Sequence, residues 1–286
     1  MVQTVLYSEI FKSIQGEGHY TGVTTVWLRF FGCNLECQGF GQEDPTDPST
    51  YKLPYLDIDL TDITKVEDLP VFPYGCDSSY SWSKRYKHLQ KKESIEEVST
   101  QLLNLLKHDN HLAFTGGEPL LKAAQKNIVR IVEYLNVCIG HPLSPKNFPK
   151  ITIETNGTKS LIPDLHNTIQ ASNTEFFFSC SPKIFGTSGE ACAIYPDVVS
   201  GYNQASEFGQ LKFVCNGSNR SWDEIEEAIE QFRSAGVTYP IWIMPVGATE
   251  ESQHDNAALV AEQTMEKGYN VSARVHCYIW GNKIGT

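Results

Sequence analysis

Residues 26–37 read VWLRFFGCNLEC, an apolar, strand-like run that ends in Cys33 and Cys37. A third cysteine, Cys76, stands in the sequence GCDSSYSW, with 38 residues between it and Cys37. Three thiolates gathered at the end of one strand can hold three corners of a 4Fe–4S cluster and leave the fourth iron open. The three cysteines therefore predict a cluster at which a small molecule could bind and accept an electron.

Zinc is the alternative partner of these cysteines, because scattered cysteines can also build a zinc site. No fourth Cys or His stands at a compact zinc-ribbon spacing nearby, which favours iron and sulfide. Eight cysteines in 286 residues are not the disulfide framework of a small secreted domain, so a reducing cytoplasm is the expected setting. We expect the other five thiols to be free and mostly buried: Cys138, Cys180, Cys192, Cys215 and Cys277.

The formal net charge of −11 argues against a general nucleic-acid-binding surface, which needs an excess of Lys and Arg. It leaves room for a local basic pocket that binds an anionic ligand. No run of 18 apolar residues is present, and the N-terminus lacks a basic start followed by an apolar core. The sequence therefore predicts neither a membrane span nor a secretion signal.

From residue 94 onward, short apolar runs alternate with helical patterns. Ser94 with Glu97 forms a capping-box pattern at the start of one helix, and Ser221 with Glu224 suggests another. Such alternation implies a parallel sheet with right-handed crossovers, whose ligand site lies at the carboxyl ends of the strands. We expect strands at 26–31, 111–114, 150–154, 176–180, 211–215, 240–245 and 272–276, and helices from 94, around 128–135, from 221 to near 236, and around 250–267.

Seven strands are too few for a closed eight-stranded barrel. The predicted fold class is therefore α/β, a partial TIM-like barrel formed by a single domain over residues 1–286. Residues 39–75 interrupt the alternation of apolar runs and helical patterns, with five prolines, six aspartates and little helical periodicity. This segment is expected to be an irregular loop insertion with short extended pieces. A disordered surface loop is the alternative, but an ordered flap is favoured because Cys37 and Cys76 fix both of its ends.

Four further segments carry a resemblance to a known family: FKSIQGEG at 11–18, TGGEPLL at 115–121, ETNGT at 154–158 and IWGNKIGT at 279–286. The split cysteine motif resembles the CxxxCxxC motif of radical S-adenosylmethionine (SAM) enzymes, opened by an insertion. TGGEP alone is common among radical SAM proteins, whereas its combination with the other segments is specific. From residue 8 to the end, the chain resembles the 7-carboxy-7-deazaguanine synthases of queuosine and deazapurine biosynthesis.

The resemblance implies a lyase that rearranges 6-carboxy-5,6,7,8-tetrahydropterin to 7-carboxy-7-deazaguanine with loss of ammonia. SAM would bind the open iron of the cluster, be cleaved to a 5′-deoxyadenosyl radical that abstracts a substrate hydrogen, and be regenerated. Mg²⁺ is expected at the substrate carboxylate. The resemblance also implies a homodimer in the cytoplasm with a flavodoxin-type electron donor.

The motif IQGE should lie beside the pterin if the resemblance holds, through Ile14, Gln15, Gly16 and Glu17. An amide and a carboxylate suit the donor-rich edge of an aminopyrimidinone, and a glycine lets the backbone approach a flat ring. A simple turn is the alternative interpretation of this motif.

Arg29 stands in an otherwise apolar strand and needs an anionic partner if it is buried. That partner is either the substrate carboxylate or an internal ion pair. The resemblance makes Glu17, Arg29 and His276 the expected catalytic residues, although a lone His on a terminal strand is often structural. Thr115 and the carboxylate of Thr286 are further expected substrate contacts, and residues 280–283 would close over the substrate.

Asp77 and Ser78 follow the third cysteine, where the family usually has Asp-Thr. Ser78 supplies the oxygen that would bind Mg²⁺, a hard cation, but lacks the methyl group that fixes the threonine rotamer. A helix N-cap is the alternative role of Ser78. The resemblance assigns SAM binding to Asp77, Gly117, Glu118, Glu154, Ser181 and Lys183, because a carboxylate pairs with the SAM ammonium group.

Two other functions stay open at this point. One is a different radical SAM enzyme, such as an activase that places a radical on a partner protein. The other is a non-catalytic scaffold that binds iron–sulfur or zinc. The resemblance at both ends of the chain favours the synthase over both.

Overall fold

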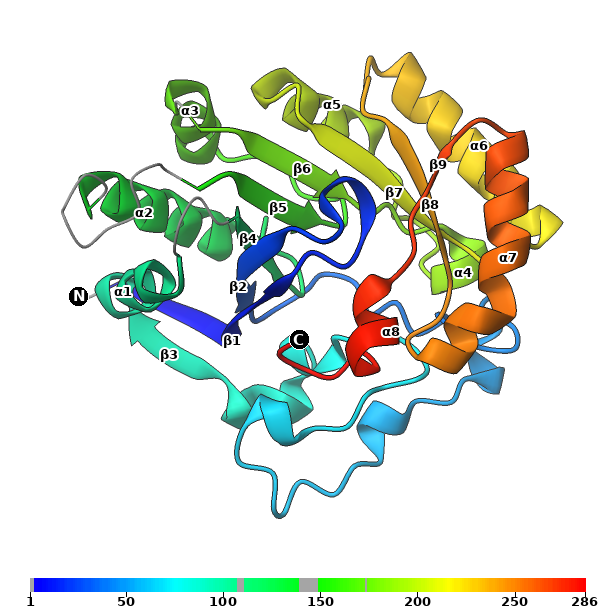
Figure 1. The fold of residues 1–286 in the computed structure, drawn as a ribbon, viewed down its shortest axis with the longest axis horizontal. Coiled ribbons are helices and arrows are strands. Elements are labelled where there is room, and N and C mark those ends of the chain that lie inside the picture. The colour runs from blue at the N-terminus through cyan, green and yellow to red at the C-terminus, as the bar shows by residue number, and fades with distance from the viewer. Residues whose placement is uncertain (1–2, 107–110, 139–148, 173) are drawn as a thin grey trace.

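The protein is described by a computed structural model covering residues 3–106, 111–138, 149–172 and 174–286. These residues form a nine-stranded sheet with strand order β3-β1-β2-β4-β5-β6-β7-β8-β9 (Figure 1). All pairings from β2 to β9 are parallel, and β1 pairs antiparallel with β2 and β3. The strands are β1 Thr4–Ile14, β2 Thr24–Phe30, β3 Lys91–Ser94, β4 His111–Gly116, β5 Ile151–Thr155, β6 Phe176–Cys180, β7 Gly209–Cys215, β8 Ile241–Pro245 and β9 Asn270–Val271.

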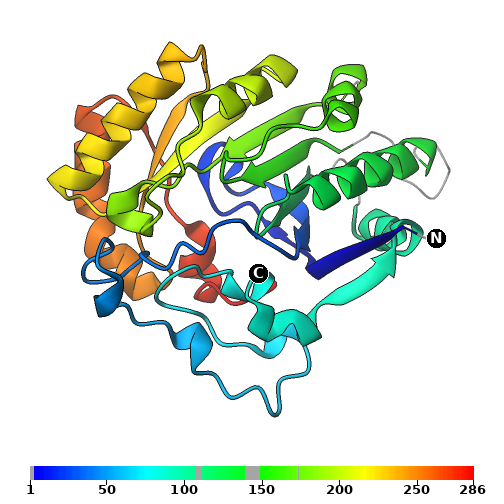
Figure 2. The ribbon, with the colours of Figure 1, turned by 180° about the vertical axis from the view of Figure 1, so that it is seen from behind.

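The helices cover the outer side of the curved sheet, as both views show (Figures 1 and 2). Neighbouring helices pack in sequence, α1 on α2, α2 on α3, α3 on α5 and α5 on α6. Every residue of β6 and β7 is buried, as expected for parallel strands covered on both faces. The helices are α1 Ile95–Leu105, α2 Lys122–Cys138, α3 Pro163–Ala171, α4 Phe185–Ser188, α5 Pro196–Ala205, α6 Asn219–Ser234, α7 Glu250–Glu266 and α8 Val275–Trp280.

The predicted α/β class with a mostly parallel sheet is confirmed, and so is the capping box of Ser94 with Glu97. The sequence prediction missed the antiparallel strands β1 and β3 and the helices α3, α4 and α5. It also placed the start of α6 too late, because Ser218 caps this helix through the amide of Ser221. No helix in the described part of the chain combines the length and apolar character needed to cross a membrane.

The strand predicted at 272–276 is wrong. The last strand is the two-residue β9, and the chain then turns into helix α8. The apolar run Val275–Trp280 suits either structure, and short runs of this kind do not distinguish strand from helix. His276 therefore lies on a helix at the sheet's carboxyl edge.

The 39–75 insertion is irregular but packed. It contains three short 3-10 turns, Pro48–Thr50, Pro54–Leu56 and Val66–Asp68, with extended backbone beside them, as at Tyr51 and Lys65, but no β-strand. A second hydrophobic cluster joins the insertion to the segment after it and to the C-terminal tail. Its members are Tyr55, Val66, Leu69, Phe72, Tyr80, Tyr86, Leu89 and Ile284.

The two ends of the insertion meet at its base. The amide of Gly75 donates to the carbonyl of Phe40 at 2.8 Å. This hydrogen bond joins the two ends of the insertion, and we call the joined ends its neck. Inside the loop, the buried side chain of Gln42 bonds the backbone amide and the carbonyl of Lys52, each at 2.8 Å. The long excursion therefore leaves Cys76 beside the loop that carries Cys37.

We predict that Phe72→Ala loosens the insertion while the main core stays folded. Phe72 is 1% exposed, and removing a buried phenyl ring costs about 3 kcal/mol of packing. Limited proteolysis should cut the variant faster within 39–75 than the unmodified chain. Leu56→Ala, at a side chain that is 47% exposed in the same insertion, is the matched control and should leave the rate unchanged.

Candidate active site

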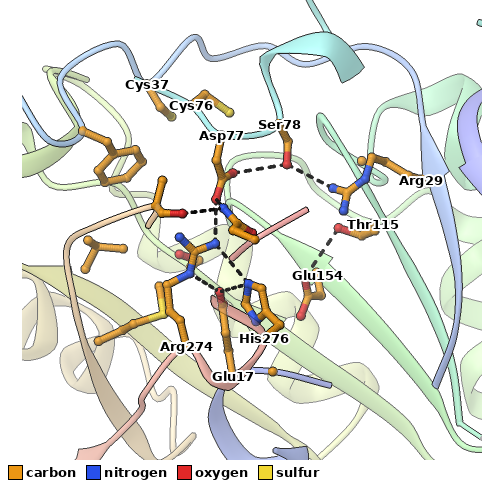
Figure 3. A pocket seen from close by; sticks show the side chains of 18 of the residues that line it. Glu17, Arg29, Cys37, Cys76, Asp77, Ser78, Thr115, Glu154, Arg274 and His276 are labelled. Carbon is orange, nitrogen blue, oxygen red and sulfur yellow. Dashed lines mark hydrogen bonds and ion pairs between the residues drawn. The ribbon is translucent and has the colours of Figure 1, made fainter. Parts of the chain in front are cut away.

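A cavity of about 280 Å³ opens at the carboxyl edge of the parallel strands. Its walls come from the cysteine segments, the ends of β4 to β8, the insertion and the C-terminal tail. Figure 3 shows side chains from these segments pointing into it. It is lined by all but one of the predicted site residues: Ile14, Gln15, Gly16, Glu17, Arg29, Cys33, Cys37, Cys76, Asp77, Ser78, Thr115, Gly117, Glu154, Ser181, Lys183, His276 and Thr286.

The three predicted cluster cysteines lie together in one wall. Cys33 Sγ accepts from the amide of Leu35 at 3.4 Å and from Asn156 Nδ2 at 3.9 Å. Burial, with smaller contributions from the nearby Glu118 and Cys76, raises the pKa of the Cys33 thiol to about 12. Burial also raises the pKa of Cys37 and of Cys76, and the ammonium group of Lys183 opposes the rise in all three. These groups are therefore thiols at neutral pH in this structure, and a positive partner is needed to hold them as thiolates.

The thiols do not converge on one point. In the described ranges, no group of three or more His, Cys, Asp or Glu side chains is arranged to hold a single metal ion. A 4Fe–4S cluster is wider than one ion and holds its cysteines farther apart. Three thiols around one cavity fit the donor set of a cluster with an open iron, and the zinc alternative stays open.

The other cysteines only partly match the prediction. Cys180, Cys215 and Cys277 are buried and free, as expected. Cys138 is half-buried, and Cys192 is exposed, so burial was wrongly predicted for Cys192.

The TGGEP turn supports the first cysteine loop through its backbone. A methyl group on Gly117 would lie 2.2 Å from the carbonyl oxygen of Gly32, so only glycine fits there. The amides of Gly117 and Glu118 donate to the carbonyls of Phe30 and Gly32, at 3.3 and 2.8 Å. The loop that ends β4 thus fixes the backbone just before Cys33.

Glu118 is the predicted residue that does not line the cavity. Its fully buried carboxylate accepts from the amide of Leu120, the hydroxyl of Thr155 and the amide of Asn156, each at 2.8 Å. All three donors belong to the protein, so the structure does not place this carboxylate in the cavity wall. In this structure, Glu118 holds the turn after β5, which brings Asn156 to Cys33.

A network of buried and half-buried charges lines the cavity floor (Figure 3). Glu17 pairs with Lys212 and with Arg274, whose Nε lies 2.8 Å from Glu17 Oε1. Arg274 also reaches Asp77 Oδ2 at 2.6 Å and the carbonyl of Gly247 at 2.8 Å. Burial alone would raise the pKa of Glu17, but Lys212 and Arg274 outweigh it and hold that pKa well below its usual range.

Asp77 is held ionised in the same way. Burial would raise the pKa of Asp77, and the Arg274 guanidinium lowers it below the ordinary value. The network therefore presents two ionised carboxylates that can accept hydrogen bonds but cannot donate a proton.

Lys212 and Arg274 are site residues that the sequence analysis missed. Lys212 stands in the apolar strand Leu211–Cys215, the same signal that singled out Arg29. Arg274 lay in the stretch interpreted as a terminal strand. Both are buried, and each depends on Glu17 for charge compensation.

Arg29 makes the internal ion pair that was the alternative to substrate binding. Its Nε lies 2.7 Å from Oε1 of Glu9, which is 1% exposed and also accepts from Tyr80. Arg29 Nη1 points the other way and donates to Ser78 Oγ at 3.2 Å. The guanidinium therefore stays fixed from behind while its outer edge lines the cavity.

Ser78 does not act as a helix cap. It precedes the 3-10 turn Ser79–Ser81, but its side chain makes no capping bond. Its hydroxyl instead donates to Asp77 Oδ1 at 3.2 Å. Two hard oxygens thus lie side by side at the cavity, a suitable donor set for Mg²⁺, which keeps most of its other ligands as water or substrate.

A third polar group joins three segments at the cavity. Glu154 accepts from Gln15 Nε2 at 2.9 Å and from Thr115 Oγ1 at 3.5 Å. Gln15 Oε1 in turn accepts from the amide of Glu17 at 3.0 Å. An amide, a hydroxyl and a carboxylate therefore lie together, although the sequence analysis assigned Glu154 to SAM and the other two to the substrate.

A flat ring does pack against the backbone of Gly16. It is the imidazole of His276, whereas the sequence analysis expected the pterin ring. A methyl group on Gly16 would lie 1.9 Å from His276 Nδ1. His276 Nε2 lies 3.4 Å from Arg274 Nη2 and 4.0 Å from Glu17 Oε1. Burial and the positive charge of Arg274 lower the pKa of His276 to about 4, so the imidazole is neutral at pH 7.

The remaining predicted residues close the rim. Lys183 Nζ donates to Ser181 Oγ at 2.9 Å. Asn282 and Lys283 line the cavity with Thr286, whereas Trp280 and Gly281 do not. Ile284 packs in the insertion cluster and ties this tail to the insertion.

These features define a class: an α/β protein with a mostly parallel sheet and a polar, cysteine-bearing cavity at its carboxyl edge. The crystal structure of QueE from Escherichia coli shares this fold, with a TM-score of 0.56 and 18% identity, over 96% of this chain and 95% of that one. No family model matches the sequence.

Curated relatives point to one particular enzyme. The chain is 26% identical to 7-carboxy-7-deazaguanine synthase of Halobacterium salinarum, over 96% of this chain and 90% of the relative. It is 25% identical to the synthase of Rhodopirellula baltica (99% and 89%) and 24% identical to that of Pyrobaculum aerophilum (97% and 95%). The resemblance to this synthase family is confirmed, and the relatives support the prediction of an enzyme.

We predict that Gly16→Ala disturbs the site through His276. The added methyl group would overlap the imidazole, so the ring and the neighbouring Arg274 must shift. His276 should lose its low pKa, which titration of its ring signals by NMR would measure. Gly201→Ala is the control, because a methyl group there meets nothing within 4 Å. An unchanged His276 signal in Gly16→Ala would contradict the packing described.

We also predict that His276 makes stability depend on pH. Its pKa is about 4 when folded, against 6.5 for an unperturbed histidine, so between these values the unfolded chain binds more protons. The free energy of unfolding should therefore fall as pH drops from 6.5 to 4, by up to about 3 kcal/mol for this residue. Denaturant titrations should give a shallower fall for His276→Gln and an unchanged one for His254→Gln, at an exposed histidine.

Proposed function

We propose that the chain is a radical SAM enzyme that converts 6-carboxy-5,6,7,8-tetrahydropterin into 7-carboxy-7-deazaguanine and ammonia. The observation that carries the proposal is the meeting of Cys33, Cys37 and Cys76 in one cavity with the polar groups of four strand ends. The names of the relatives support the same reaction. The open, curved sheet would be the incomplete barrel of radical SAM enzymes, formed by a single domain.

The three cysteines would hold a 4Fe–4S cluster, and Ser81 would help to place their loops by accepting from the amide of Gly32 at 2.7 Å. When bound, the cluster would supply the electron that cleaves SAM. Gly117, Ser181, Lys183 and Asp77 line the cavity on the cluster side and would contact SAM.

The charge network would bind and orient the substrate. The outer edge of Arg29 would pair with the substrate carboxylate, since its other edge is already neutralised by Glu9. Gln15, Thr115 and Glu154 would meet the amide-like edge of the pterin ring. Because Glu17 stays ionised and His276 neutral, both would accept hydrogen bonds at pH 7, and neither would serve as a proton donor.

Enclosure matters because a primary carbon radical attacks whatever it touches. The insertion and the C-terminal tail both line the cavity and would keep water out while the target hydrogen is held in contact. We further propose a cytoplasmic homodimer with a flavodoxin-type donor, as the family resemblance implies.

The deciding experiment is anaerobic turnover of the reconstituted protein with SAM, the carboxytetrahydropterin and a strong reductant, followed by mass analysis. Formation of 7-carboxy-7-deazaguanine with little net loss of SAM is expected. SAM cleavage without that product would favour a radical activase instead. A colourless protein that binds zinc and no sulfide would overturn the proposal.

We predict that Ser78→Ala weakens the Mg²⁺ response and leaves the cluster intact. The change removes the hydroxyl beside Asp77 but touches no thiol. Activity titrated with Mg²⁺ should need about tenfold more metal, as for the loss of one oxygen ligand. Ser81→Ala, at a hydroxyl that bonds the backbone of Ser78 from behind, is the control. If the metal dependence of Ser78→Ala matches the unmodified chain, Ser78 is not a magnesium ligand.

A further inference from the structure

Glu190 lies in the connection after α4 and reaches across to the first cysteine loop. Its Oε1 accepts from two consecutive backbone amides, those of Glu36 at 2.8 Å and Cys37 at 2.6 Å. No other side chain in the described residues accepts a hydrogen bond from these two amides. One carboxylate oxygen thus occupies the concave face formed by adjacent N–H groups, an arrangement suited to an anion.

The backbone at this point is strained. Cys37 has φ +49°, in the left-handed region, and only one other described non-glycine residue, Asn282, has a positive φ. A side chain in this region costs free energy and persists only where the surroundings hold it. The two charge-assisted bonds from Glu190 offset this cost, because hydrogen bonds to a charged acceptor are stronger than neutral ones.

The segment around Glu190 is itself fixed against the insertion. The carbonyl of Ser188 accepts from the amide of Gly39 at 3.0 Å. A methyl group on Gly39 would lie 2.6 Å from the amide nitrogen of Gly189, so the two backbones are in direct contact. The support for Cys37 therefore comes from the last residue of α4 and the segment just after it.

We propose that Glu190 is a positioning residue that holds Cys37 in the geometry needed to bind the cluster. This inference rests on the proposed function, since it concerns a cluster ligand. Glu190 does not line the cavity. It acts on the reaction only through the backbone of Cys37.

The test compares three variants of the full chain after anaerobic reconstitution with iron and sulfide. Glu190→Ala should release iron to a chelator about tenfold faster than the unmodified chain, because both charged hydrogen bonds are lost. Glu190→Gln keeps an oxygen that accepts both bonds and should stay within about threefold. Glu36→Gln is the matched control, since it removes an exposed carboxylate beside Cys37 and leaves the two hydrogen bonds to Glu190 in place.

A second readout needs no cluster. Hydrogen exchange of the Glu36 and Cys37 amides should speed up in Glu190→Ala, while exchange in β6 and β7 stays unchanged if the variant is folded. Equal iron release and equal amide exchange in Glu190→Ala and the control would overturn the inference. Failure of the unmodified chain to bind iron and sulfide would overturn the proposed function. Amide exchange would then still test whether Glu190 bonds the amides of Glu36 and Cys37.

Discussion

The neck of the insertion, closed by the hydrogen bond from Gly75 to Phe40, is the constraint on which the site depends. Without it, the third cysteine would lie at the far end of a long loop, and closing that loop around a cluster would cost chain entropy each time. With the neck closed, the packing of a small hydrophobic cluster offsets this entropy loss when the protein folds. The split motif then presents its thiols as a compact motif would.

Electrostatics organises the rest of the cavity. Lys212 and Arg274 are buried, Glu17 and Asp77 lie half-buried beside them, and the four charges neutralise one another. Pairing of this kind is costly to break, because removing one member leaves an uncompensated charge. The network therefore fixes the positions of these charged side chains before any ligand binds. That is the condition for electrostatic preorganisation.

Much of this could be predicted from local sequence. The parallel sheet follows from apolar runs separated by helical patterns, and seventeen of the eighteen expected site residues line the cavity. Glu118 does not, because its carboxylate accepts from backbone amides instead. Arg274 was hidden because a short apolar run does not distinguish strand from helix. Glu190 gives no periodic signal at all, since its role depends on a contact with a residue 153 positions away.

The tail residue Ile284 has a consequence for access to the cavity. Because it packs in the same cluster as Tyr55 and Phe72, the tail cannot leave its place without exposing apolar surface in the insertion. The two segments therefore form one cooperative unit, and the opening of the cavity mouth is a local unfolding event rather than a free swing of a loop. Entry and exit of ligands would then share the temperature and denaturant sensitivity of that small cluster.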